Sequence, residues 1–274
     1  MSEVYREHQA VAERVAIAAG EFLLNAYGRV EAREKRPGDL VTDADLGSQE
    51  LIAERILDAF PDHTILAEED GLVADPSKSW RWVVDPLDGT INFAHGFPFW
   101  AVSIALEHEG RLVVGVVHNP LAGATYSAAM GRGALFNGKA AGVSAADRLR
   151  DSLIATALPV DFQADVDRQM SLFRRFSTGT HSVRRTGSSA LNLALVATGG
   201  FDVCYATFMN PWDAAAGVVI VREAGGLVTD LDGGPYDVYG EEILATNGRV
   251  HEESLRWIAG CDPGRASGPP PDRE

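Results

Sequence analysis

The nine-residue stretch WVVDPLDGT, residues 82–90, is the part of the sequence that best indicates the fold. Its apolar start predicts a buried strand, and Pro86 predicts a turn directly after that strand. Such a turn brings Asp85 and Asp88 to the same side of a tight loop. The carbonyl oxygen of Leu87, between them, can face the same cation. The stretch therefore predicts a set of oxygen ligands for a metal ion.

The last two residues of the stretch suit a phosphate group. Gly89 lets the backbone approach a ligand closely. Thr90 stands where a helix can begin, and it also brings a hydroxyl group. Exposed N–H groups at the start of a helix bind phosphate well. Metal ligands and a phosphate cradle are thus predicted within one short segment.

Further acidic residues follow apolar runs or open a helix: Asp43, Asp45, Glu68, Glu69 and Asp213. A carboxylate at the end of a buried strand is costly unless a cation neutralises it. Basic residues are scarce in these segments, and Mg²⁺ prefers hard oxygen ligands. Each acid taken alone could instead cap a turn or a helix and contact solvent. The set as a whole favours a magnesium site.

Two more segments are candidates for the same site. Gly187, Ser188 and Ser189 open a predicted helix after a strand-like run, and small residues at a helix start suit a polar ligand. Asp213 lies in the first turn of the next predicted helix, after Pro211, where the helix dipole stabilises its charge.

Composition restricts the class of protein. The chain has 274 residues, 46% of them hydrophobic, which is enough for a large core. The net charge of −15 disfavours nucleic acid as a partner. Two cysteines form neither a disulfide framework nor a metal knuckle. No segment resembles a signal peptide or a membrane span, so we expect a cytoplasmic protein.

Hydrophobic periodicity predicts a mixture of helices and short strands. The predicted helices cover about 3–27, 46–59, 165–176, 188–198, 211–224 and 248–259. The predicted strands cover 64–67, 82–84, 101–106, 112–117, 124–128, 153–156, 201–205, 227–229 and 243–245. This order indicates a layered α+β architecture. We divide it into an N-terminal half (1–145), a C-terminal half (146–262) and a Pro- and Gly-rich tail (263–274) that we expect to be disordered.

Three motifs closely resemble the signature segments of the inositol monophosphatase family. They are AEED (67–70), DPLDGTINF (85–93) and NPWDAAAG with VREAGG (210–226). The resemblance extends in order over residues 5–260. It implies an αβαβα sandwich, commonly a homodimer, that hydrolyses a small phosphomonoester with roughly two to three Mg²⁺ ions per site and is inhibited by Li⁺.

The resemblance also implies a role for each candidate residue. The metal ligands would be Glu68, Asp85, the Leu87 carbonyl, Asp88 and Asp213. Thr90, in contact with Asp45, would orient and deprotonate the attacking water. The substrate would contact Asp88, Gly89, Thr90, Gly187, Ser188 and Ser189. Asp43 and Glu69 would support the ligands from behind.

The sequence departs from the family pattern at one position. Family members that act on inositol phosphates carry a Glu seven residues before the last metal-binding Asp, and here that residue is Ala206. The carboxylate that would bind substrate hydroxyls is absent, so inositol specificity is in doubt. Histidinol phosphate, fructose 1,6-bisphosphate and 3′-phosphoadenosine phosphates remain alternative substrates.

Two other functions compete with this interpretation. Haloacid-dehalogenase phosphatases use a DxDGT motif whose first Asp is phosphorylated, but the motif here is one residue longer and lies well inside the chain. A non-catalytic regulator that binds metal and phosphate is the second alternative. The complete set of predicted ligands argues against it, and any Mg²⁺-dependent turnover would exclude it.

Overall fold

The protein is described here by a computed structural model that covers residues 2–29, 33–36, 39–69, 75, 78–158 and 166–261. The helices are α1 (Ser2–Ala26), α2 (Asp43–Ala59), α3 (Thr90–Ala94), η1 (Leu149–Asp151), α4 (Val166–Gly179), α5 (Ser189–Ala197), α6 (Pro211–Glu223) and α7 (His251–Ala259). Among these described helices, none is long and apolar enough to cross a bilayer.

The strands form two sheets and a hairpin. The seven-stranded sheet has the order β3 (Thr64–Ala67), β4 (Trp80–Asp88), β5 (Ala101–His108), β6 (Arg111–Asn119), β7 (Ala124–Ala129), β8 (Ala134–Phe136), β9 (Lys139–Ala141). The five-stranded sheet has the order β11 (Ser182–Arg184), β10 (Leu153–Ala157), β12 (Val203–Ala206), β14 (Ile243–Thr246), β13 (Leu227–Thr229). The hairpin pairs β1 (Arg33–Arg36) with β2 (Asp39–Val41).

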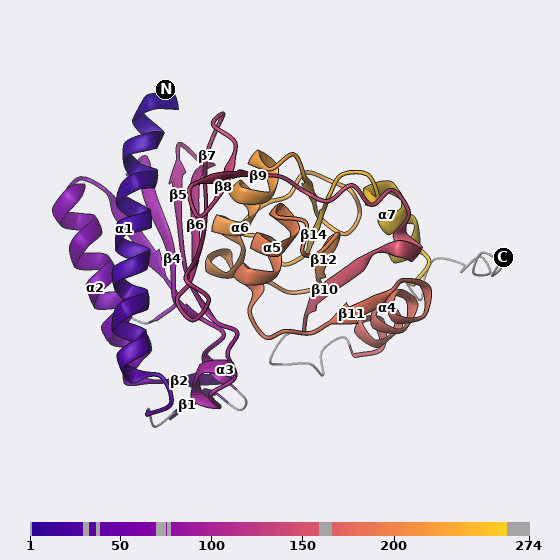
Figure 1. The fold of residues 1–274 in the computed structure, drawn as a ribbon, viewed down its shortest axis with the longest axis horizontal. Coiled ribbons are helices and arrows are strands. Elements are labelled where there is room, and N and C mark those ends of the chain that lie inside the picture. The colour runs from indigo at the N-terminus through magenta and orange to yellow at the C-terminus, as the bar shows by residue number, and fades with distance from the viewer. Residues whose placement is uncertain are drawn as a thin grey trace.

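These elements stack in five layers (Figure 1). Helices α1 and α2 cover one face of the seven-stranded sheet, α5 and α6 lie between the two sheets, and α4 and α7 cover the outer face of the five-stranded sheet. Three clusters of buried apolar side chains fill the four spaces between these layers, because one cluster extends over both sides of α5 and α6. The predicted αβαβα sandwich is confirmed. The division at residue 145 stays a prediction, and the tail 263–274 lies outside the described residues.

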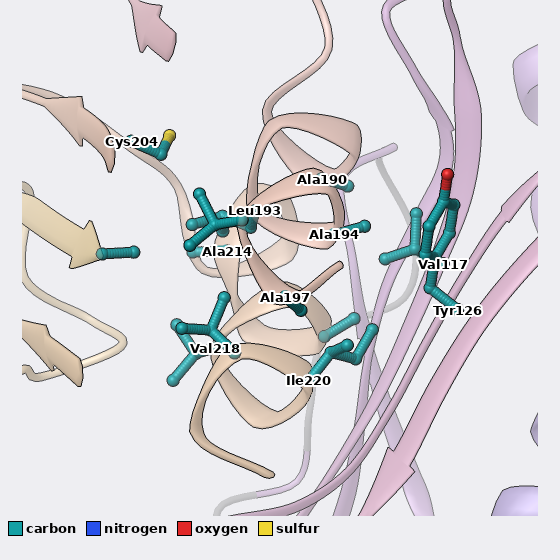
Figure 2. Close-up of a cluster of buried hydrophobic side chains, with 14 of the residues drawn as sticks. Val117, Tyr126, Ala190, Leu193, Ala194, Ala197, Cys204, Ala214, Val218 and Ile220 are labelled. Atoms are coloured by element: carbon teal, nitrogen blue, oxygen red, sulfur yellow. The ribbon is translucent and has the colours of Figure 1, made fainter. Parts of the chain in front are cut away.

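The central layer holds the two sheets together. In Figure 2, Val117 and Tyr126 of the seven-stranded sheet lie on one side of α5 and α6, and Cys204 of the other sheet lies on the opposite side. Small residues allow close packing here. A Cβ atom at Gly115 would lie 2.3 Å from the carbonyl oxygen of Ala216 in α6. Only glycine therefore permits this approach, which positions the start of α6 beside β4.

The structure corrects the predicted turn at Pro86. Strand β4 continues through Pro86 to Asp88. Its register against β5 shifts between Asp85 and Asp88, because β4 advances by three residues there while β5 advances by two. Proline lacks an N–H donor, so it is tolerated at such a bulge. The bulge, rather than a turn, changes the direction in which the two carboxylates point.

Several boundaries also differ from the prediction. Helix α2 begins at Asp43 because Thr42 caps it, and Asp45 completes a capping box that the apolar pattern does not reveal. The short strands β1, β2, β8 and β9 were not predicted. Three or four residues carry too little periodicity to be recognised.

A stack of rings closes the end of the N-terminal half that lies far from Asp88. His8 stacks on Trp80 with ring centroids 4.9 Å apart, and His63 stacks on the same ring at 5.1 Å. The indole nitrogen of Trp82 donates to Nδ1 of His63 at 3.0 Å, so that nitrogen is an unprotonated acceptor. Burial, together with the nearby charge of His8, lowers the pKa of His63 to about 4.

Replacing His63 with glutamine is expected to make folding less sensitive to acid. The unfolded chain binds a proton at His63 below about pH 6.5, whereas the folded chain does not bind it until about pH 4. The free energy of unfolding therefore falls as the pH drops through this window. For a half-buried ring we expect a loss of about 1–2 kcal/mol. Glutamine keeps an acceptor for Trp82 but does not titrate.

Urea unfolding at several pH values between 4 and 7 measures this effect. The fall in unfolding free energy should be smaller in His63→Gln than in the wild type. Equal slopes would show that His63 titrates normally in the folded protein.

Candidate active site

Three carboxylates from two layers meet at one point. Asp85 and Asp88 come from the β4 bulge, and Asp213 comes from the first turn of α6. One oxygen of each lies within 4.8 Å of the others. Within the described part of the chain, no Arg or Lys forms an ion pair with any of the three. The negative charge of this cluster is therefore not neutralised by side chains.

The electrostatic cost of burying these three acids together raises their pKa values. Burial, then the charges of Glu68 and the other two acids, raises the pKa of Asp85 well above its usual range. Burial raises the pKa of Asp88 to about 6. Burial, together with the charge of Asp88, raises the pKa of Asp213 to about 7. A divalent cation would relieve all of these costs at once.

Gly89 connects the acid cluster to α3. Its φ of +95° is in the left-handed region, and it occupies the N-cap position of α3. A Cβ atom there would lie 3.1 Å from the carbonyl oxygen of Gly187 and 3.2 Å from that of Phe99. Both the conformation and the crowding therefore require glycine.

Asp88 is held by the start of α5. Ser188 Oγ donates to its carboxylate, and the N–H groups of Ser189 and Ala190 donate to it at 3.0 Å each. These bonds lower the pKa of Asp88 and partly offset its burial. The structure thus places Ser188 and Ser189, which were predicted to contact substrate, directly on a predicted metal ligand.

Thr90 and Asp45 meet as the resemblance implied. Thr90 Oγ1 lies 2.9 Å from Asp45 Oδ1 and 3.0 Å from the carbonyl oxygen of Leu87. Asp45 is 1% exposed, and its other oxygen accepts hydrogen bonds from the N–H and hydroxyl of Thr42. The capping box of α2 therefore orients the carboxylate toward Thr90.

Not every predicted residue joins the cluster. Glu68 is near enough for its charge to raise the pKa of Asp85 and Asp88, although it is not in the tight group of three. Glu69 is buried, with its backbone paired to the Gln49 side chain. Asp43 faces solvent and forms an ion pair with Arg33. The expected supporting role of Asp43 does not agree with this position.

Asn92 is a residue that sequence reasoning missed. Its amide nitrogen lies 2.6 Å from the carbonyl oxygen of Phe99 and 2.9 Å from that of Thr186. It therefore ties α3 to the loop that carries Gly187. An asparagine just after the start of a predicted helix gives no signal of this link, because both partners are backbone atoms distant in sequence.

The donor set fits a hard divalent cation. The three carboxylates offer only oxygen atoms, which Mg²⁺ prefers over nitrogen or sulfur. Helix α3 begins directly after Asp88 and Gly89, with no side chain capping its first N–H groups. The arrangement can neutralise a phosphoryl group and hold a water molecule next to it.

Comparison with known proteins agrees with this geometry. The sequence model of the inositol monophosphatase family matches residues 5–259. The chain belongs to this family. An inositol-1-monophosphatase from Synechocystis is 42% identical over 251 residues, covering 91% of this chain and 88% of that protein.

Two further relatives extend the comparison. A putative Nus factor SuhB from Neisseria meningitidis is 38% identical over 249 residues, covering 90% of this chain and 95% of that protein. The solved structure of the inositol monophosphatase from Anabaena superposes with a TM-score of 0.87 at 36% identity, covering 95% and 98% of the two chains. The protein is therefore a phosphatase that hydrolyses phosphoric monoesters.

Proposed function

We propose that the protein hydrolyses a small sugar or polyol phosphomonoester with Mg²⁺ and a water nucleophile. The observation that carries this proposal is the convergence of Asp85, Asp88 and Asp213 without a basic partner among the described residues. Such a cluster is unfavourable by itself and favourable around cations. The family membership of the chain supports the same reaction.

The metal site in this proposal uses five groups: Glu68, Asp85, the Leu87 carbonyl, Asp88 and Asp213. When bound, roughly two to three Mg²⁺ ions would neutralise the phosphoryl oxygens and lower the pKa of the attacking water. The carboxylates of β4 bring the charge, and the start of α6 brings Asp213 to the opposite side.

The protein's own side chains and backbone N–H groups position the attacking water and the phosphate. Thr90 and Asp45 orient the water, and Asp45 Oδ1 receives its proton through the Thr90 hydroxyl. The N–H groups of Gly89 and Thr90 bind phosphate oxygens at the start of α3. Gly187 lies against this turn, where it can border the substrate.

The substrate is not expected to be recognised at position 206. Ala206 is completely buried in the central core and pairs with Ile243 of β14. It offers no polar atom to a polyol hydroxyl. We therefore propose weaker discrimination for inositol 1-phosphate than a Glu at this position would provide.

Phosphate release from a panel of substrates tests the proposal. The panel comprises inositol 1-phosphate, fructose 1,6-bisphosphate, histidinol phosphate and 3′-phosphoadenosine 5′-phosphate, each with Mg²⁺, with EDTA, and with Mg²⁺ plus Li⁺. We expect turnover only with Mg²⁺ and inhibition by Li⁺. No turnover of any compound would favour the non-catalytic alternative, and a trapped aspartyl-phosphate would favour the haloacid-dehalogenase mechanism.

Replacing Ser188 with alanine is expected to weaken Mg²⁺ binding about 10- to 100-fold, because the hydroxyl orients a metal ligand. Saturating Mg²⁺ should restore most of kcat, and Ser188→Thr should retain normal affinity. Mg²⁺ titration of phosphatase activity measures this. A raised KM for substrate with unchanged Mg²⁺ dependence would instead support direct substrate contact.

A second candidate function is binding of nucleic acid. It is suggested by relatives that are named Nus factors. A direct contact with nucleic acid is disfavoured by the net charge of −15, so we propose small phosphomonoesters as the ligands. Electrophoretic mobility shift with RNA at low salt tests this. A saturable shift would support binding of nucleic acid by this chain.

We also propose a cytoplasmic homodimer, because the resemblance to the family implies one. Light scattering coupled to size-exclusion chromatography gives the mass in solution, and a monomer mass at micromolar concentration would contradict the dimer.

A further inference from the structure

A second pocket lies away from the acid cluster. It has a volume of about 560 Å³ and opens between the β5–β6 hairpin, the last turn of α6 and the segment 236–239. We call it the hairpin pocket. Its lining includes Arg111, Leu112, Met130, Arg222 and Tyr236. A volume of this size is typical of sites for small molecules.

The hairpin pocket is distinct from the catalytic site. Along β5, Ala101 pairs with Asp88, whereas Glu107 at the other end lines the pocket. Six residues of strand separate them by roughly 20 Å. Along α6, Asp213 and Arg222 are nine residues apart, or roughly 14 Å.

The acidic residues of the hairpin pocket already have partners. Glu107 accepts a hydrogen bond from the Tyr239 hydroxyl and forms an ion pair with Arg81 at 3.7 Å. Asp237 accepts from the Tyr239 N–H at 3.0 Å. Glu223 accepts from three consecutive N–H groups, those of residues 131–133, at 2.8, 3.0 and 2.8 Å. Glu107 is thus paired with a cation, and the carboxylates of Glu223 and Asp237 are held in place by backbone N–H groups.

The two arginines of the hairpin pocket have no such partner. Neither Arg111 nor Arg222 forms an ion pair or a side-chain hydrogen bond with any described residue. The chain carries 39 acidic and 24 basic residues, so an arginine has many acids available to pair with. The hairpin pocket therefore holds two guanidinium groups that can bind the oxygens of a ligand.

A third unsatisfied group belongs to Tyr236, a residue that lines the same pocket. The hydroxyl oxygen of Tyr236 is buried and has no hydrogen-bond partner. Burial raises the pKa of Tyr236, so the hydroxyl keeps its proton and remains a donor. Leaving such a buried donor unpaired destabilises the protein. A bound acceptor would relieve this destabilisation.

We propose that the hairpin pocket is a second ligand site, which binds a small organic anion. Arg111, Arg222 and the Tyr236 hydroxyl would bind the oxygens of a carboxylate or a phosphate group. The apolar body of the ligand would lie against Leu112 and Met130. The two guanidinium groups only donate hydrogen bonds and carry positive charge, and the phenol hydroxyl can also donate, which favours an anion over a cation. This site does not depend on the proposed catalytic chemistry.

Binding measurements on the full chain with Mg²⁺ test the hairpin pocket. Benzoate is the carboxylate probe and phenylphosphonate is the phosphate probe, both followed by isothermal titration calorimetry. We expect Arg222→Gln to weaken benzoate binding at least tenfold and Tyr236→Phe to weaken it severalfold. Phenylphosphonate should show two sites in the wild type and one, at the metal centre, in Arg222→Gln.

Two controls show whether the effects are specific to the hairpin pocket. Arg174→Gln removes an exposed arginine on α4 and should leave both probes unaffected. Phosphatase KM should be unchanged in Arg222→Gln, which shows that the catalytic site is intact. The relative affinity of the two probes tells a carboxylate from a phosphate ligand. Equal probe affinity in wild type and Arg222→Gln, or no saturable benzoate binding in the wild type, would overturn the proposal.

Discussion

Replacing Asp85 with asparagine is expected to reduce phosphatase activity by about 1,000-fold or more. The amide cannot supply the charge that holds a divalent cation, and losing about 4 kcal/mol of transition-state stabilisation corresponds to this factor. Asp85 is a cleaner choice than Asp88, because Asp88 also receives three hydrogen bonds from the start of α5. The measurement is kcat/KM for phosphate release at saturating Mg²⁺.

The same substitution is expected to stabilise the metal-free protein. The pKa of Asp85 is raised by burial and by neighbouring carboxylates, so above its unfolded value of 3.8 the ionised side chain lowers the stability of the fold. Asparagine removes this charge. Thermal unfolding in EDTA at pH 7 should therefore show a higher midpoint for Asp85→Asn than for the wild type.

Asp58→Asn is the matched control for both effects. Asp58 is exposed on α2, so its replacement should change neither activity nor the midpoint. The two opposite effects of Asp85→Asn distinguish a metal ligand from a structural acid. Wild-type turnover, or a lower midpoint in EDTA, would contradict the assignment of Asp85.

Replacing Thr90 with valine is expected to lower kcat by about 100- to 10,000-fold, the range for loss of general base assistance. Valine keeps the shape of the side chain but removes the hydroxyl that contacts Asp45 at 2.9 Å. A hydroxyl has a single proton. If the Leu87 carbonyl binds a cation as proposed, that proton would be directed to Asp45, and valine removes this contact.

The Mg²⁺ concentration for half-maximal activity should stay the same in Thr90→Val, because valine retains every proposed metal ligand. Thr90→Ser keeps the hydroxyl and should retain most of kcat. Steady-state kinetics with a Mg²⁺ titration separates the two quantities. A valine variant with more than half of the wild-type kcat would exclude a role for Thr90 in activating water.

The outcome for α2 and Pro86 shows where sequence reasoning reaches its limit. The apolar pattern located the body of α2 but missed its first turn, because capping depends on polar contacts of Thr42 and Asp45. Pro86 read locally indicates a turn, yet pairing with β5 carries β4 past it as a bulge. In both cases the deciding interaction involves atoms that periodicity does not describe.

The sequence by itself indicated the fold class and named the candidate acids of the site. Apolar periodicity and the motif 85–93 are local in the chain, so they can be read without knowing the fold. The tertiary structure decided which acids share one point, that Asp43 is excluded from it, and that Ser188 holds Asp88. It also revealed the hairpin pocket, whose walls come from distant segments. Such contacts depend on how the layers pack. Packing brings together residues that are far apart in the chain, and local sequence patterns do not show which of them will be close in space.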